Sequence, residues 1–342
     1  MEHRKIMALG KSSRVVSLPK EWLRVNQLSQ GSTVTVYMQG DGSLVIYPVS
    51  EKSDEVKRIE LGVLKSESVE SVTRRIIGAY LDGYSHIVLS SDGIFTVDQQ
   101  TAIRAIIRRL YMMVINSEAK RIELETLIDE SKASVSSCVE RMHLITYSMF
   151  RDTIKSLKDW DPNLINSVIS LEDDVDQLTY LVLRILRSAA VKPGLANELK
   201  LDPLDCLDYQ TLVHRVEWAA DNVINIAECL RYMMEGGLRL PSEARSVLLN
   251  AAEIAFESYG KAVECYLHLD IEPTNGIIDK QGEIRRLYME ITPLPKFSET
   301  YDTSVLTNIM TIRENIMKIS DLAADIAELT IDRAYKVHGG SR

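Results

Sequence analysis

The chain has 342 residues, of which 45% are hydrophobic and 26% are charged. This length predicts two or three domains, and the apolar content is sufficient for a core. Gly and Pro are sparse, which is typical of a helix-rich soluble protein. No apolar run is long enough to span a membrane and the N-terminus lacks the apolar stretch of a signal peptide, so we expect a cytoplasmic protein without membrane insertion. The cysteines stand far apart without CxxC spacing, which argues against a disulfide framework or a zinc site: Cys138, Cys206, Cys229 and Cys265.

The net charge of −9 is spread unevenly along the chain. Residues 1 to 50 contain six Lys and Arg against three Asp and Glu, a net +3 that leaves −12 for the rest. Only this basic N-terminal segment is therefore suited to approach a polyanion such as DNA.

The first 50 residues are predicted to form a small β-rich domain. β-Branched residues cluster at 14–18, 33–37 and 43–47, a one-turn helix is expected near Pro19, and Gly40-Asp-Gly42 signals a hairpin turn. A unit of this size has too few residues for a core of its own, so we expect it to dimerise.

This segment resembles the SpoVT/AbrB swapped-hairpin family. The resemblance rests on Gly10-Lys-Ser-Ser-Arg-Val-Val-Ser-Leu-Pro-Lys-Glu-Trp-Leu23, Leu28-Ser-Gln-Gly-Ser-Thr-Val34 and Gly42-Ser-Leu-Val-Ile46, although Ser32 stands where the family usually has Asp. It implies that two chains interlace their hairpins and that basic side chains grip DNA: Lys5, Lys11, Arg14, Lys20 and Arg24. The alternative is that this domain only dimerises the protein.

After a charged linker at 51–57, residues 58–130 are predicted to form a ferredoxin-like α+β domain. Strands are expected at 58–63, 86–90, 93–96 and 120–125, with helices at 69–84 and 100–114, which gives the order βαββαβ. We find no catalytic constellation in this domain, whose arginines are expected to be mostly solvated: Arg74, Arg75, Arg104, Arg108 and Arg109.

Residues 132–338 are predicted to be entirely helical. Apolar residues recur every three or four positions, and Pro or Gly punctuates the pattern, with one such break at Pro293-Leu-Pro295. Six helices are expected, and they would form tandem three-helix bundles: 133–158, 164–191, 204–234, 242–270, 276–291 and 302–337.

An internal repeat supports two copies of one helical unit. Residues 214–228 are echoed by residues 314–328, with Asp221 matching Asp321, and residues 168–178 are echoed by residues 277–287. The first copy has a Glu-x-x-x-Asp motif on each of two helices. In the second copy three of these four carboxylates are replaced, by Gln281, Arg285 and Met317, so carboxylate chemistry is expected in the first copy alone.

Three acidic segments characterise this half of the chain: Glu172-Asp-Asp-Val-Asp-Gln-Leu178, Glu217-Trp-Ala-Ala-Asp-Asn-Val-Ile-Asn-Ile-Ala-Glu228 and Asp321-Leu-Ala-Ala-Asp-Ile-Ala-Glu328. On these residues the half resembles the PhoU family, which regulates phosphate uptake. An AbrB-like domain joined to such helices resembles an archaeal type of phosphate-uptake regulator.

The acidic motifs predict a metal site. Residues four apart share a helix face, so Glu172 with Asp176, and Glu217 with Asp221, form two carboxylate pairs. If the two helices are neighbours, four carboxylates converge, and a multinuclear site of Fe, Mn, Mg or Zn would relieve their repulsion. The alternative is a solvated acidic face paired with lysines and arginines.

The sequence predicts no enzyme, because it contains no Walker A, GxSxG or HExxH motif and no GxGxxG in a strand–helix context. Two hypotheses remain. The first is a DNA-binding regulator of phosphate uptake whose helical part senses phosphate status through a metal or a partner. The second is a signalling adaptor that dimerises through its N-terminal domain and binds the phosphate transporter ATPase or a sensor protein without contacting DNA.

Overall fold

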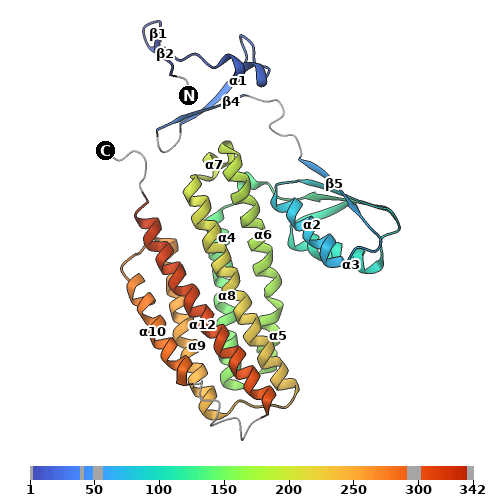
Figure 1. The fold of residues 1–342 in the computed structure, drawn as a ribbon, viewed down its shortest axis with the longest axis vertical. Coiled ribbons are helices and arrows are strands. Elements are labelled where there is room, and N and C mark those ends of the chain that lie inside the picture. Colours follow the sequence, from blue (N-terminus) through green and yellow to red (C-terminus); the bar gives the residue numbers. More distant parts are fainter. Residues whose placement is uncertain (1–2, 39–41, 49–56, 291–301, 337–342) are drawn as a thin grey trace. The chain divides into compact units, whose positions relative to one another are not determined.

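The computed structural model describes residues 3–38, 42–48, 57–290 and 302–336 (Figure 1). The chain divides into two compact units at about residue 55. Three sequence features fall largely outside the described residues: the turn at 40–42, the linker at 51–57 and the break at 293–295.

The first unit consists of two separate antiparallel hairpins and a short helix. The elements are β1 (Met7–Leu9), β2 (Ser13–Val15), α1 (Lys20–Val25), β3 (Val34–Met38) and β4 (Leu44–Pro48). The strand expected at 14–18 ends at Val15, and β1 was not predicted, because Gly10 with a φ of 69° reverses the chain after only three strand residues. None of the described residues of this unit is buried.

The second unit begins with an α/β domain of residues 58–126. Its elements are β5 (Arg58–Val63), α2 (Val69–Leu81), β6 (His86–Ser91), α3 (Val97–Arg109), β7 (Met112–Ser117) and β8 (Arg121–Thr126). The sheet order is β5-β6-β8-β7, with β5 and β6 parallel and the other pairs antiparallel, and β7 carries a bulge between Val114 and Asn116.

The predicted ferredoxin-like order βαββαβ is therefore wrong, and the observed order is βαβαββ. No strand forms at 93–96, because Thr96 and Gln99 make a capping box that starts α3 at Val97. The helix consequently ends at Arg109, and Met112–Ser117 becomes a strand instead of the last turn of a helix.

Helices α2 and α3 pack on each other and cover one face of this sheet (Figure 1). Ile87 and Leu89 of β6 alternate toward the helices and share a core with Ile76, Tyr80 and Ile103. The opposite face carries charged side chains, among them Glu123, which pairs with Arg121 and His86.

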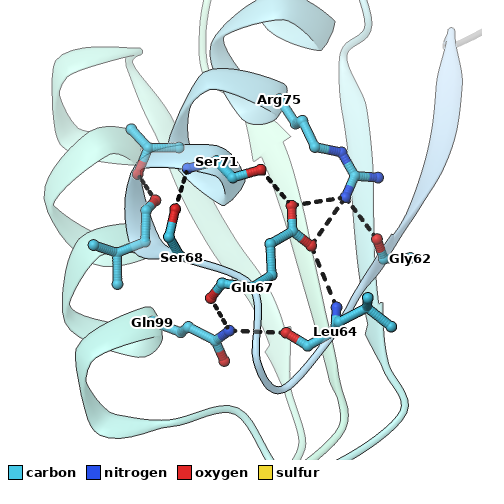
Figure 2. A network of polar contacts seen from close by, with 9 residues as sticks. Gly62, Leu64, Glu67, Ser68, Ser71, Arg75 and Gln99 are labelled. Carbon is cyan, nitrogen blue, oxygen red and sulfur yellow. Dashed lines mark hydrogen bonds and ion pairs between the residues drawn. The ribbon is translucent and has the colours of Figure 1, made fainter.

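A polar network joins the starts of α2 and α3 (Figure 2). The Glu67 carboxylate accepts hydrogen bonds from Ser71 Oγ at 2.7 Å and from Arg75 Nη1 at 3.2 Å, and the bond from Ser71 contributes most to lowering the Glu67 pKa. Gln99, which is 1% exposed, donates to the carbonyls of Leu64 and Glu67. Arg75 is thus paired rather than solvated.

The rest of the second unit is helical. After a 3₁₀ turn (Glu130–Lys132), the helices are α4 (Val135–Asp159), α5 (Pro162–Ser170), α6 (Glu172–Val191), α7 (Pro193–Leu199), α8 (Pro203–Glu235), α9 (Ser242–His268), α10 (Thr274–Glu290) and α12 (Thr303–Ala334). Helices α4, α6 and α8 pack on one another, as do α9, α10 and α12, and contacts of α8 with α12 and of α4 with α9 join the two groups around a continuous core. None of the described helices is long and apolar enough to cross a membrane.

The helix expected at 164–191 is broken at Leu171 into α5 and α6. Three acidic residues, Glu172, Asp173 and Asp174, form the first turn of α6. Negative side chains stabilise a helix N-terminus, so the acidic motif favours a new helix start at this position.

Two arginines of α6 fasten the α/β domain to the helical part. Arg184, 1% exposed, donates to the carbonyls of Tyr80 at 2.5 Å and Tyr84 at 2.9 Å, and its Nε lies 2.7 Å from Glu130 Oε1. Arg187 donates to the Leu81 carbonyl and pairs with Asp82. Both arginines place positive charge at the C-terminal end of α2, where the helix dipole favours it.

Candidate functional site: an acidic cluster on α6 and α8

The four carboxylates singled out in the sequence lie on two helices that pack on each other. Glu172 and Asp176 belong to the first two turns of α6, and Glu217 and Asp221 to the middle of α8. Asp176 interacts electrostatically with Asp221 and with Glu217, and Glu172 interacts with Asp221. The four side chains therefore form one acidic cluster.

Burial and mutual repulsion raise the pKa of every member of the acidic cluster. Partial desolvation beside the helix pair, together with the charges of Glu217 and Glu172, raises the pKa of Asp221 to about 6, although this residue keeps an exposed surface. Burial followed by the charge of Asp176 raises the pKa values of Glu172 and Glu217. The cluster thus brings together four carboxylates that repel one another, and their negative charge favours a cation.

A cation from the α/β domain already contacts the acidic cluster. Arg109, the last residue of α3, places Nη1 3.1 Å from Asp176 Oδ2 and also pairs with Asp173. After burial, which raises the pKa of Asp176, the largest influence is Arg109, which lowers it. Arg109 was expected to be solvated and is paired instead, and Asp173 was given no role, because their pairing depends on tertiary packing and has no local signal.

Two further residues of α6 hold the end of α3 beside the acidic cluster. Gln177 Nε2 donates to the Arg108 carbonyl at 2.8 Å. Tyr180 packs against the core of the α/β domain, and burial followed by the charges of Asp176 and Glu217 raises its pKa. No local sequence pattern predicts either role.

The donor set of the acidic cluster suits a hard metal cation, since it consists of carboxylate oxygens alone. However, in the part of the chain that the structure describes, no three His, Cys, Asp or Glu side chains form a group that could hold a metal ion. The guanidinium of Arg109 is the cation that stands at Asp176 instead. The carboxylate oxygens of the acidic cluster are suitable metal ligands, but their arrangement while Arg109 pairs with Asp176 does not form a metal site.

The second helical repeat has a different arrangement at the equivalent position. Asp321 of α12 accepts a hydrogen bond from Gln281 of α10, whereas Arg285 is exposed. Arg215 of α8 pairs with Asp325 of α12 at 3.1 Å and ties the two repeats together.

The basic side chains of the N-terminal unit are all exposed: Lys5, Lys11, Arg14, Lys20 and Arg24. Arg24 pairs with Glu21 on α1 at 3.3 Å, and Arg14 Nη1 lies within hydrogen-bond distance of the Ser13 carbonyl. Apolar side chains are exposed on the same unit, among them Met7, Val36 and Met38.

Two family models match the chain. The PhoU domain matches residues 139–230, which include α6, most of α8 and the whole acidic cluster. The model described as "Antidote-toxin recognition MazE, bacterial antitoxin" matches residues 8–54. A comparison with curated proteins found no match.

Solved structures of two bacterial PhoU proteins resemble the helical part. PhoU from Pseudomonas aeruginosa is 19% identical, with a TM-score of 0.50 over 58% of this chain and 93% of that chain. The phosphate transport system regulatory protein PhoU from Streptococcus pneumoniae is 14% identical, with a TM-score of 0.48 over 58% of this chain and 91% of that chain. The chain therefore carries a PhoU domain, joined to an N-terminal domain of the MazE and AbrB type.

Proposed function

We propose that this protein is a PhoU-type regulator of phosphate uptake, in which the N-terminal unit binds DNA as a dimer and the acidic cluster binds metal ions. The observation that carries the proposal is the acidic cluster within the PhoU domain, in a chain that also has a MazE-type domain. The metal would be a divalent or trivalent ion such as Fe, Mn, Mg or Zn, held by Glu172, Asp176, Glu217 and Asp221.

Dimerisation is supported by the surface of the N-terminal unit. Met38 is 76% exposed and Val25 is 69% exposed, and no described residue of the unit is buried. Such a unit gains a hydrophobic core only by packing against another chain. Light scattering of the full chain at micromolar concentration should report a dimer or a larger assembly, and a monomer would contradict the proposal.

DNA binding is supported by exposed basic side chains of this unit, among them Lys5, Lys11, Arg14, Lys20 and Arg24. Replacing Arg14 and Lys20 by Ala should weaken binding to DNA from phosphate-transporter promoters, and should reduce the log–log salt slope by about one per lost phosphate contact. The matched control replaces Lys155 and Lys158, two exposed lysines of α4. If both double variants bind alike, the interaction is not made by the N-terminal unit.

Metal binding is tested by Glu217→Gln with Asp221→Asn, which keeps the side-chain shapes and removes two charges. We expect this variant to lose bound metal in elemental analysis, and metal binding in the unaltered protein to weaken at acid pH because the carboxylates must be deprotonated. The control is Asp279→Asn with Glu283→Gln, an exposed pair four residues apart on α10. Equal metal content in both variants would assign the bound metal to another place.

A second candidate function is a signalling adaptor that uses the N-terminal unit to dimerise or bind protein and binds the phosphate transporter ATPase or a sensor through the helices. The description of the matching family as a toxin-recognition antitoxin favours it, because that recognition is between proteins. No binding of the unaltered protein to promoter DNA, together with a dimer in solution, would select this function.

A further inference from the structure

The contact between Arg109 and the acidic cluster joins two parts of the chain. Arg109 lies at the C-terminal end of α3 in the α/β domain, whereas Asp173 and Asp176 lie at the N-terminal end of α6. The Asp176 side chain is 21% exposed and that of Arg109 is 38% exposed, so the pair is partly withdrawn from water. One ion pair therefore connects the site to the position of the α/β domain.

The α/β domain is held on α6 at two separate places. The first is the acidic end of the helix, where Arg109 pairs with Asp176 and Gln177 donates to the Arg108 carbonyl. The second lies about two turns further along, where Arg184 and Arg187 bind the end of α2. Only the first place shares a side chain with the acidic cluster, so the two places can respond differently to a change in that cluster.

We propose that Arg109 and a metal cation compete for the acidic cluster, so that metal binding releases the end of α3 from α6 while Arg184 keeps the domain attached. This inference rests on the proposed metal site. A cation coordinated by Asp176 takes the oxygen that accepts from Arg109, and its positive charge repels the guanidinium. The ion pair and the metal site thus exclude each other.

The α/β domain then reports whether the acidic cluster holds a metal. With Arg109 in place, the C-terminal end of α3 is fixed on α6 by the ion pair and by the Gln177 hydrogen bond. With a metal in place, the Arg109–Asp176 ion pair is lost, and the end of α3, with the start of β7, becomes more mobile because it keeps only the Asp173 pair and the Gln177 hydrogen bond. The device needs no change in the buried contacts of Arg184.

The test compares Mn²⁺ binding by the unaltered protein, Arg109→Gln and Arg187→Gln, with free Mn²⁺ measured by electron paramagnetic resonance. Removing the competing charge should tighten Mn²⁺ binding on the order of tenfold in Arg109→Gln, since a partly exposed ion pair contributes roughly 1 kcal/mol. Arg187→Gln is the control, because it also removes one positive charge from this interface but breaks a pair with Asp82, which lies outside the acidic cluster. This variant should bind Mn²⁺ as tightly as the unaltered protein does.

Hydrogen exchange supplies a second readout. In the unaltered protein, saturating Mn²⁺ should accelerate amide exchange at residues 108–114, and in Arg109→Gln the same amides should exchange fast with or without Mn²⁺. Equal Mn²⁺ affinities in the unaltered protein and Arg109→Gln would overturn the competition and leave the proposed metal site standing. Absence of Mn²⁺ binding in all three proteins would overturn both.

Discussion

Replacing Arg184 by Met should loosen the α/β domain more than any exposed substitution at the same interface. The change keeps most of the side-chain volume and removes a charge that is 1% exposed. It also removes the side-chain donor of the Tyr80 and Tyr84 carbonyls, and leaves Glu130, whose side chain is 11% exposed, with Lys192 at 3.7 Å in place of its closer partner.

The magnitude follows from the burial of this ion pair. Removing one partner of a buried pair costs about 3–5 kcal/mol, because the remaining charge stays desolvated. The pair of Glu130 with Lys192 remains, so we expect a cost at the lower end of this range. Arg187 pairs with Asp82 at the same interface, but the two side chains are 53% and 54% exposed, so Arg187→Met should cost less than about 1 kcal/mol.

Native-state hydrogen exchange of the amides of β6 measures the effect, since Ile87, Val88 and Leu89 are fully buried and exchange only when the domain opens. A loss of about 3 kcal/mol corresponds to more than 100-fold faster exchange. In a double-mutant cycle with Glu130→Gln, the two changes should couple by about 1 kcal/mol or more. An acceleration below tenfold, or additive effects in the cycle, would refute the reasoning.

Three further predictions concern the helical part. Gly260→Ala should destabilise the protein by about 1–3 kcal/mol in thermal or urea unfolding, because the new Cβ would lie 2.7 Å from the Tyr147 ring. Gly276→Ala, whose new Cβ would meet nothing within 4 Å, should stabilise the protein by up to about 1 kcal/mol. A stabilised Gly260→Ala variant would show that the Tyr147 ring moves freely. Burial lowers the pKa of His143 to about 4, so the unfolded chain binds the proton more tightly and the folded protein loses stability as the pH decreases from about 6.5 to 4. His143→Leu should remove up to about 3 kcal/mol of that loss, and an unchanged dependence of stability on pH would contradict this. The raised pKa of Asp221, about 6, means that the folded protein loses stability as the pH rises from about 4 through 6. In metal-free buffer, calorimetry should therefore find that Asp221→Asn stabilises the protein by up to about 1 kcal/mol at pH 7 and leaves its stability unchanged at pH 4.

Long helices were the most predictable part of the fold. Apolar periodicity sustained over many turns places α8, α9 and α12 within a few residues of their observed bounds. The break at Leu171 was missed because the apolar stripe continues through Val168, Leu171 and Val175, while the acidic first turn of α6 decides where the new helix starts. Periodicity reports which face is buried and carries little information on helix ends.

The α/β domain shows how a short segment misleads. Gly93-Ile-Phe-Thr96 was interpreted as a strand from its apolar residues, whereas Phe95 is buried beside a helix start that Thr96 and Gln99 cap. For the acidic cluster, helical spacing predicted two carboxylate pairs, each on one face of its own helix. The structure shows that the two pairs interact. Their role as metal ligands stays a prediction. Arg109 could not be identified, since it meets Asp176 only through packing of segments 67 residues apart.

The sharing of α6 between the α/β domain and the helical part has a consequence for biosynthesis. The carbonyl of Tyr80 and the guanidinium that binds it are 104 residues apart in the chain. At a synthesis rate of about 5–20 residues per second, the sheet and its two helices are complete roughly 3–13 s before α6 has been made, since β8 ends at Thr126 and α6 at Val191. During that interval the end of α2 and the Glu130 carboxylate face water. The α/β domain therefore reaches its final stability only after a later part of the same chain has left the ribosome.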